Sequence, residues 1–229
     1  MSYHLNFFFV LRDLDKFLDG LVVTLKLTVL ANAIGLSAGF GVALLVMSPV
    51  RIVHWPAMAF VEFFRCTPAL IQIVWFFYCV PMLFDVFLDA VTMGVLALGL
   101  NLTAFNAEAY RAAIQAIPRA HHDASVALGL SRRARILHVV FPQAVRMALP
   151  VLITNAIGCF QQSALVSLVA VSDLMYQAKM LSTQTYRPIE TFTFVAGIYL
   201  AISFPVSQLA TYFERRNARR LAGWARAPR

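Results

Sequence analysis

Charged residues, cysteines and nucleotide-binding motifs are scarce in this chain, and each scarcity removes a class of function. Charged residues make up 13% of the 229 residues. Cys66, Cys79 and Cys159 have no paired spacing and no histidine at ligand distance, so we expect buried thiols and no zinc site. The pattern G-x-x-x-x-G-K-[ST] is absent, so the chain cannot bind ATP through a P-loop.

The side chains that enzymes use for catalysis are also poorly grouped. His121 and His122 are adjacent, so on a helix they point about 100° apart and cannot readily share a metal ion. A membrane-embedded enzyme would need a nucleophile paired with a base, or a metal cluster, and Ser163 and the isolated histidines supply neither. We expect no catalytic residue, no metal site and no cofactor bound by this chain.

Long apolar runs dominate the rest of the sequence. Apolar residues make up 60% of the chain and the mean hydropathy is +0.73, values that a soluble domain does not usually tolerate. A helix needs about 20 residues to cross a bilayer. Five blocks are long enough: Leu21–Met47, Trp55–Phe84, Val86–Ala107, Met147–Ala170 and Phe192–Phe213. The sequence therefore predicts an all-α, polytopic membrane protein with about five transmembrane helices in a single domain, residues 1–229.

The distribution of basic residues predicts the orientation. Five spans place the termini on opposite sides, and the side richer in Lys and Arg is cytoplasmic. With the N-terminus outside, the outer side keeps only Arg12, Lys16, Lys179 and Arg187. The inner side then holds Arg51, Arg111, Arg119, Arg132, Arg133, Arg135, Arg146, Arg215, Arg216, Arg219, Arg220, Arg226 and Arg229. The net charge of +8 thus reports topology, and we expect no nucleic-acid partner.

Several polar residues lie inside the predicted spans, where they are expensive unless they pair or line a cavity. Glu62 and Arg65 stand three residues apart on one helical face and could pair. Asn101 and Glu108 are seven apart and share a face of the third span. Such a stripe indicates either hydrogen bonds between helices or the lining of a polar path. The candidate path residues are Glu62, Asn101, Thr103, Glu108, Gln161 and Ser163.

Two features of the first two spans predict how helices pack and bend. The first span is rich in small residues, which let helices approach closely in lipid: Ala31, Gly35, Ala38, Gly39, Gly41 and Ala43. In the second span, Pro68 can kink the helix by freeing a carbonyl near Phe64.

Residues 118–142, here called the elbow, form a charged stretch between the third and fourth apolar blocks. Pro118 starts a helix that runs from Arg119 to Leu128, and Gly129 is free to adopt positive φ at its end. Ser131 caps a second helix, Arg132–Val140, which Pro142 stops or bends. The first helix carries a small apolar face that fits a groove in a partner protein, made of Ala120, Ala124, Ala127 and Leu128. A loop lying on the membrane surface is the other interpretation.

The elbow resembles the EAA loop of binding-protein-dependent ABC importer permeases, whose pattern is E-A-A, three residues, G, nine residues, I-x-L-P. With the spacing kept, the matching residues are Asp123, Ala124, Ser125, Gly129, Val139, Phe141 and Pro142. Further motifs resemble the polar amino-acid (histidine/arginine/glutamine type) subfamily, and the resemblance covers about residues 17–216. They are GLVVTLKLT at 20–28, FRCTPALIQ at 64–72, AEAYRAAIQAIP at 107–118, ALGLS at 127–131 and PQAVRMALP at 142–150. The family's Lys-Asp-Thr/Ser-Ser-Leu is replaced by QQSAL at 161–165, which removes two charges near the path.

This resemblance implies an ABC type I permease fold in the bacterial inner membrane, with the N-terminus periplasmic and the C-terminus cytoplasmic. The elbow would be the coupling helix, seated in a groove of a cytoplasmic ATPase subunit that uses ATP and Mg. Its coupling residues would be Asp123, Ala124, Ser125, Ala127, Leu128, Gly129, Leu130 and Ser131. A second permease subunit, identical or homologous, would enclose the path, and a periplasmic binding protein would deliver the amino acid.

The alternative function is a stand-alone secondary transporter or channel for small polar solutes. That mechanism would need inverted repeats or intramembrane charge relays, and the sequence shows neither. Acidic residues with no opposing lysine near the path favour a cationic or neutral amino acid as the solute.

Overall fold

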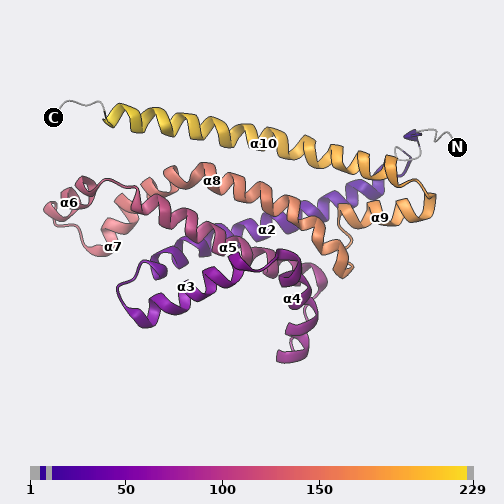
Figure 1. Ribbon diagram of the computed structural model, residues 1–229, viewed down its shortest axis with the longest axis horizontal. Helices are drawn as coiled ribbons and strands as arrows, with labels where there is room; N and C mark the ends of the chain where they lie inside the picture. The colour runs from indigo at the N-terminus through magenta and orange to yellow at the C-terminus, as the bar shows by residue number, and fades with distance from the viewer. Residues whose placement is uncertain (1–5, 9–11, 226–229) are drawn as a thin grey trace.

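The computed structural model describes residues 6–8 and 12–225, with the side chains of residue 122 and of residues 216–225 left out of the description. Within these ranges the chain is helical and has no strand, which confirms the all-α class. Four long helices follow the long axis of the molecule: α2 (Leu14–Val46), α5 (Ala90–Gln115), α8 (Phe141–Gln162) and α10 (Pro188–Ala225) (Figure 1). α2 begins at one end of this axis and α10 finishes at the other, as an odd number of crossings requires.

The second predicted span is broken. Four helical stretches are long and apolar enough to cross a membrane, and α3 (Arg51–Cys66) with α4 (Ala69–Phe84) makes a fifth when this bent pair is counted as one span. The two helices meet at an angle of 108°, so the prediction of one continuous helix over Trp55–Phe84 is wrong. The predicted kink at Pro68 is present, but it is large enough to end one helix and begin another.

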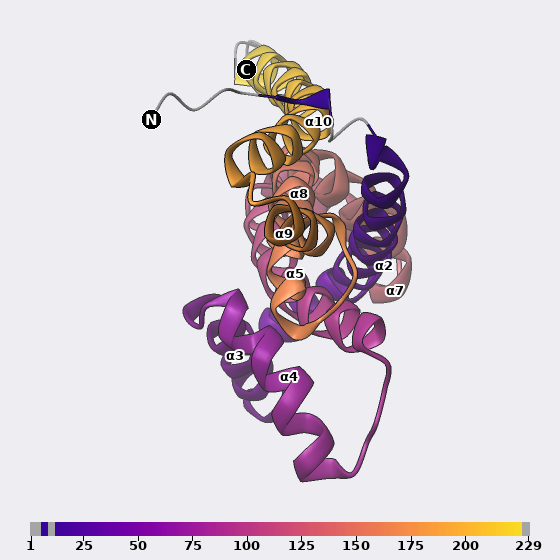
Figure 2. The ribbon, with the colours of Figure 1, turned by 90° about the vertical axis from the view of Figure 1, so that its right-hand side faces the viewer.

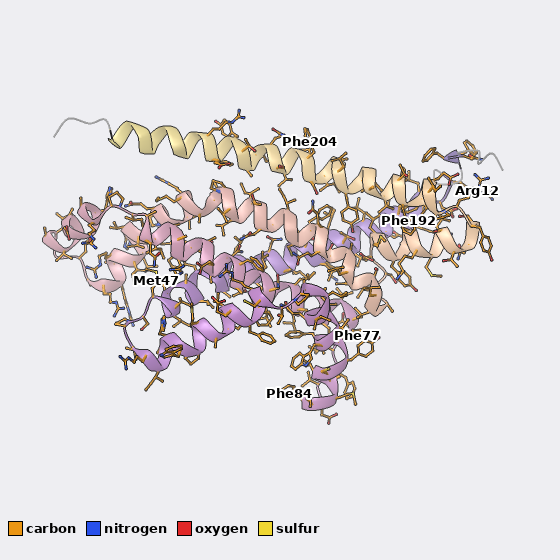
Figure 3. All side chains as sticks on the ribbon, in the orientation of Figure 1. Arg12, Met47, Phe77, Phe84, Phe192 and Phe204 are labelled. Carbon is orange, nitrogen blue, oxygen red and sulfur yellow. The ribbon has the colours of Figure 1, made fainter. Side chains whose placement is uncertain are left out.

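Proline chemistry explains where the break falls. The ring of Pro68 pushes the preceding residue out of the helical region, and Thr67 has φ −106° and ψ 142°. α4 therefore turns away from the bundle, on the side opposite to α10 (Figures 1 and 2). Phe84 lies near the far tip of α4, among large apolar side chains that the rest of the chain leaves exposed (Figure 3).

The first span packs closely against the third, as its small residues predict. Ala31, Gly35, Gly39 and Ala43 recur every four residues on the buried face of α2. A Cβ on Gly35 would lie 2.6 Å from Cγ of Leu102, and a Cβ on Gly39 would lie 2.9 Å from Cβ of Asn106. α2 and α5 can therefore approach this closely only because Gly35 and Gly39 lack a side chain.

Replacing Gly39 with alanine is expected to destabilise the protein. The new Cβ overlaps the side chain of Asn106, and overpacking a well-packed interior costs about 1–3 kcal/mol. Gly41 is the matched control, since a Cβ there meets nothing within 4 Å and alanine is the better helix former. The thermal midpoint of the purified protein should fall for Gly39→Ala and hold or rise for Gly41→Ala. Equal midpoints for the two variants would contradict the close contact of α2 and α5.

The fourth span differs from prediction at both ends. The second helix of the elbow does not stop at Pro142: α7 (Arg132–Arg135) continues through a π-helical turn, η1 (Ile136–Val140), directly into α8. A π-helical turn is wider than an α-helical one, and this one ends two residues before Pro142. At the other end α8 gives way to a 3₁₀ segment, η2 (Ser163–Val169).

Two predicted loop boundaries are also corrected. α5 begins at Ala90 instead of Val86, because the side chain of Asp89 accepts from the N–H of Thr92 at 3.1 Å and so caps the helix there. The segment between the fourth and fifth predicted spans contains a helix, α9 (Leu174–Thr185), which Asp173 caps in the same way.

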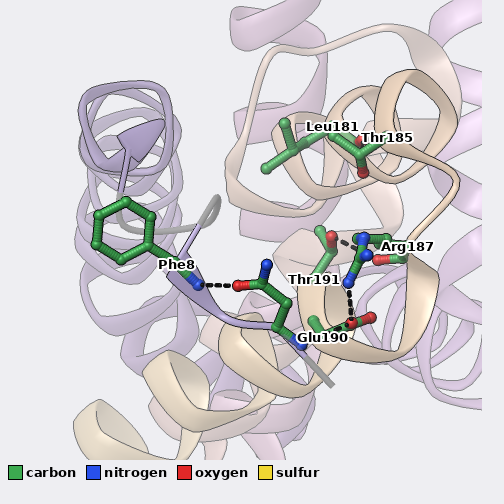
Figure 4. A network of polar contacts seen from close by, with 7 residues as sticks. Phe8, Leu181, Thr185, Arg187, Glu190 and Thr191 are labelled. Carbon is green, nitrogen blue, oxygen red and sulfur yellow. Dashed lines mark hydrogen bonds and ion pairs between the residues drawn. The ribbon is translucent and has the colours of Figure 1, made fainter. Parts of the chain in front are cut away.

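The corner between α9 and α10 is tied to the N-terminal segment. Glu190 is fully buried, and its Oε1 accepts from Nη1 of Arg187 at 3.0 Å and from the N–H of Asn6 at 3.2 Å. Oδ1 of Asn6 in turn accepts from the N–H of Phe8 at 2.9 Å (Figure 4). This network fixes the start of α10 at the end of the bundle away from the elbow.

Candidate functional site

The elbow has the turn chemistry that its sequence predicts. α6 (Arg119–Ala127) follows Pro118 and ends at Leu128. Gly129 then has φ +70°, a conformation that only glycine adopts without strain. The hydroxyl of Ser131 accepts from the N–H of Ala134 at 3.3 Å and caps α7. The two helices are therefore joined by a tight turn and hold a defined angle.

The predicted apolar face of α6 points outward. The exposed residues of this helix and its end include Ala120, Asp123, Ala124, Ala127 and Leu128, the last with 79% of its surface accessible. Ser125 is different, since it is buried with 2% exposure, and Leu130 is half-buried. Ser125 therefore shapes the elbow from inside and is not available to a partner, and Leu130 is only partly accessible.

The elbow is mechanically joined to a membrane-spanning helix. α7, η1 and α8 form one helical path, so the second limb of the elbow is the beginning of the fourth span. Nε2 of Gln143, on α8, also lies 3.3 Å from Nδ1 of His121, on α6. A force on the exposed face of α6 would therefore reach α8 through both limbs.

A buried polar junction closes the break between α3 and α4. Pro68 has no N–H to give to the carbonyl of Phe64, four residues before it. That carbonyl instead accepts from Nε2 of Gln72 at 2.9 Å and from Nδ2 of Asn101 at 3.2 Å. Asn101 also donates to Oε1 of Gln72 at 2.9 Å. The carbonyl of Phe64 is freed by Pro68, as the sequence predicts. Of the two predicted roles for the polar stripe on the third span, Asn101 has the first, because it makes hydrogen bonds between helices.

A cavity of about 420 Å³ with a mainly apolar wall lies between α5 and α8, and Arg65 of α3 also lines it. Five of its eleven lining residues are alanines, and three carry polar or charged side chains, Arg65, Glu108 and Asn155. The full lining is Arg65, Phe105, Glu108, Ala109, Ala112, Ala113, Ala116, Met147, Ala148, Val151 and Asn155.

 The three polar groups of this wall are a guanidinium, a carboxylate and an amide. This set suits a small solute that carries both a positive and a negative charge.

The charges around this cavity are paired within each helix. Nε of Arg111 donates to Oε2 of Glu108 at 3.0 Å, and Nη1 of Arg65 lies 3.8 Å from Oε1 of Glu62, which confirms the predicted pair. Nδ2 of Asn155 donates to Oδ1 of Asn106 at 3.0 Å and so joins α8 to α5. Glu62 and Glu108 thus each have an arginine three residues later. The negative charge of these two residues therefore does not by itself favour a cationic solute.

The remaining candidate path residues are dispersed. Thr103 is buried with 1% exposure, and its hydroxyl donates to the carbonyl of Gly99 at 2.7 Å, within the same helix. Ser163 is fully buried at the start of η2 and donates to the carbonyl of Phe160 at 2.7 Å. Gln161 is exposed. Of the six candidates, only Glu108 lines the cavity, and Asn101 closes the junction of α3 and α4.

Sequence reasoning missed two contributors to this region, Asn155 and Gln72. Both are amides inside apolar blocks, and that polarity was the available signal. Their partners were not predictable, because Asn106 and Asn101 lie 49 and 29 residues away in the chain. Among the residues that the structure describes, no three His, Cys, Asp or Glu side chains converge on a point that could hold a metal ion.

Comparison with known proteins places this geometry in a family. Residues 31–219 match the family described as "Binding-protein-dependent transport system inner membrane component". The chain is 31% identical to the glutamate/aspartate import permease protein GltK of Escherichia coli O6:H1, over 94% of this chain and all of that protein. It is 31% identical to the probable glutamine ABC transporter permease protein GlnM of Bacillus subtilis, over 93% of this chain and 98% of that protein. It is 36% identical to the arginine ABC transporter permease protein ArtQ of Haemophilus influenzae, over 82% and 86%.

Solved structures agree with this assignment. A chain of an amino acid ABC transporter crystallised with histidines superposes with a TM-score of 0.83 at 34% identity, over 93% of this chain and all of that one. A chain of the inward-facing MetNI methionine ABC transporter has the same fold, with a TM-score of 0.74 at 19% identity, over 88% and 95%. The chain therefore belongs to the family of binding-protein-dependent transport system inner membrane components, and it is a membrane permease subunit.

Proposed function

We propose that this permease subunit forms part of the translocation path of an ATP-driven importer of polar amino acids and is moved by a separate ATPase that binds the elbow. The observation that carries the proposal is the exposed apolar face of α6 on a limb that continues into α8. A helix with an exposed apolar face needs a partner, and this one is placed to transmit that partner's motion to a span.

In this proposal the ATPase is a separate chain. This sequence has no P-loop, so ATP and Mg would be bound and used by the partner. Docking would involve the exposed residues Asp123, Ala124, Ala127 and Leu128 directly. Ser125, Gly129, Leu130 and Ser131 would act by holding the shape of the elbow, because they are buried, form the turn or cap α7.

The cavity beside Glu108 is the part of this chain that we assign to the path. Arg65 offers a positive group to a carboxylate, and Glu108 offers a negative group to an ammonium. The relatives named for glutamate and aspartate, for glutamine and for arginine share only the α-amino acid itself as a solute. We therefore infer that the chain handles the zwitterionic part of a polar amino acid. A second permease subunit, identical or homologous, would complete the path, and a periplasmic binding protein would deliver the solute.

The proposed orientation places the elbow in the cytoplasm and α9 on the periplasmic side of a bacterial inner membrane. Arg132, Arg133 and Arg135 are on the elbow, whereas the opposite end carries Lys179 and Arg187, so the positive charge is larger at the elbow end. The N-terminus would then be periplasmic and the C-terminus cytoplasmic. The side chains of the predicted basic tail beyond Arg215 lie outside the described residues.

Replacing Leu128 with glutamate is expected to reduce co-purification of the ATPase subunit at least tenfold. Leu128 is the most exposed apolar side chain of the elbow, and an unpaired charge buried in an apolar groove costs more than the roughly 1.4 kcal/mol that a tenfold change requires. Affinity purification of the tagged permease, with the ATPase quantified in the eluate, measures this.

The matched control for this experiment is Met180→Glu. Met180 is also an exposed apolar residue on a short helix, but α9 lies at the other end of the bundle. This variant should retain the ATPase at the wild-type level. Undiminished ATPase recovery with Leu128→Glu would show that the elbow is not the docking site.

A further inference from the structure

Besides Glu190, a second buried carboxylate lies at the end of the bundle opposite the elbow. Asp173, between η2 and α9, is fully buried. Its Oδ1 accepts from the N–H of Tyr176 at 2.8 Å and caps α9. Its Oδ2 is also buried and has no hydrogen-bond partner among the described residues. Leaving one oxygen of a carboxylate in this state is unfavourable when the group is charged, so its protonation state matters.

Four elements meet around this carboxylate. The N–H of Leu174, next to Asp173, donates to the hydroxyl of Thr24 on α2 at 3.1 Å. Gly20, one turn earlier on α2, packs so closely that a Cβ there would lie 2.9 Å from the carbonyl oxygen of Asp173. From α10 comes Tyr199, whose buried hydroxyl likewise has no hydrogen-bond partner within the described part of the chain. α9 is therefore held to the bundle at a site that contains two unsatisfied polar groups.

The charges that act on Asp173 do not compensate its burial. Lys179, on α9 itself, lowers its pKa only weakly, and Tyr199 of α10 presents a neutral hydroxyl. α2 and η2 contribute the hydroxyls of Thr24 and Ser163 beside Tyr199, and the charged residue of α2 nearest to this contact in sequence, Asp19, is exposed. Burial is the dominant effect, and it raises the pKa of Asp173 from 3.8 to about 6.

A second aspartate in the chain shows that capping alone does not produce this behaviour. Asp89 caps α5 by accepting from the N–H of Thr92, as Asp173 caps α9. Asp89 is exposed, however, and the hydrogen bonds from Thr92 lower its pKa. The two residues have the same role at a helix N-terminus and opposite responses to pH, because only Asp173 is removed from water.

We propose that Asp173 is a proton-binding site that fastens α9 to α2 and α10, with the proton on Oδ2 directed to the hydroxyl oxygen of Tyr199. The proton comes from the water at this end of the bundle and returns there, and no other group is consumed. Loss of the proton leaves a charged oxygen without a partner in the contact, which loosens α9. The proton-binding site does not depend on the proposed transport function. Only the periplasmic origin of the proton rests on the proposed orientation.

The direction of the pH effect follows from the raised pKa. The docked state binds the proton more tightly than the open state, so the stabilisation is complete below pH 3.8 and is lost as the pH rises through about 6. Between pH 5 and pH 7 the equilibrium constant for opening of α9 should rise about tenfold, as linkage with a docked pKa near 6 requires.

Hydrogen exchange of the full-length chain in lipid nanodiscs tests this site. Amide protection over residues 174–185, corrected for intrinsic exchange rates, should fall about tenfold from pH 5 to pH 7 in the wild type. In Asp173→Asn it should stay at its pH 5 level throughout, because the amide keeps the capping oxygen and supplies a donor without a charge. Asp89→Asn should respond to pH as the wild type does. Protection of α5 serves in each variant as the measure of correct folding.

Two results would overturn the proposal. One is the same pH response of α9 in Asp173→Asn and in the wild type. The other is recovery of α9 protection at pH 7 when choline chloride is replaced by sodium chloride, because a metal cation and not a proton would then neutralise the site.

Discussion

Replacing Asn101 with leucine is expected to lower the stability of the protein. Asn101 donates to the carbonyl of Phe64 and to Oε1 of Gln72 at the junction of α3 and α4. The variant leaves Oε1 of Gln72 without this donor and places an apolar side chain against the carbonyl of Phe64. Each buried polar group left without a partner costs about 1–3 kcal/mol, so the thermal midpoint of the purified protein should fall by several degrees.

Thr103→Val provides the matched control for Asn101→Leu. Thr103 is two residues away on α5, is also buried, and its hydroxyl donates only to the carbonyl of Gly99 in its own helix. That carbonyl keeps the backbone hydrogen bond of the helix, so the isosteric valine should shift the midpoint little. A midpoint for Asn101→Leu that matches the one for Thr103→Val would mean that the junction contributes nothing to stability.

Glu108→Gln is expected to reduce amino-acid import by about tenfold with little loss of stability. Removal of this carboxylate leaves Arg111 without its ion-pair partner and removes the group assigned to the ammonium of the solute. A loss of about 1.4 kcal/mol from this interaction corresponds to the tenfold change. Proteoliposomes that contain the full importer, with solute uptake measured at a concentration below saturation, give the rate.

Glu62→Gln separates the cavity from the general effect of losing a carboxylate. Glu62 also has an arginine three residues later, but its side chain is 47% exposed, the pair is 3.8 Å apart, and it does not line the cavity. Exposed ion pairs of this kind contribute little, so import should stay near the wild-type rate. Equal uptake by Glu108→Gln and the wild type would remove the cavity from the path.

The elbow was predictable from sequence because its shape depends on local chemistry. Gly129 needs a positive φ and Ser131 needs an N–H three residues later, and both requirements lie within a few residues of chain. The capping of α9 by Asp173 is equally local. α9 was nevertheless not predicted from the sequence, because a short helix between two spans has no long apolar block. Of the two outcomes predicted at Pro142, a stop and a bend, the stop is wrong, because the helical path continues through η1 into α8.

The polar interior was predictable in composition and not in arrangement. The spacing of Asn101 and Glu108 places them on one face of α5, but Asn101 turns to the junction while Glu108 faces the cavity. What separates them is the break at Pro68, which brings Gln72 and the carbonyl of Phe64 to Asn101. The angle of that break depends on contacts between residues far apart in the chain, and a single sequence carries no record of those.

The junction at Pro68 also has a consequence for the order of events during synthesis. α3 and α4 have 16 residues each, about 24 Å of helix, which is shorter than the roughly 30 Å hydrocarbon core that a span must cross. Lipid offers no partner to the carbonyl that Pro68 frees. Gln72 is made only four residues after Pro68, whereas Asn101 follows Gln72 by 29 residues. The growing chain therefore carries its own donor for the bend before α5 exists, and the later helix binds to a corner that is already closed.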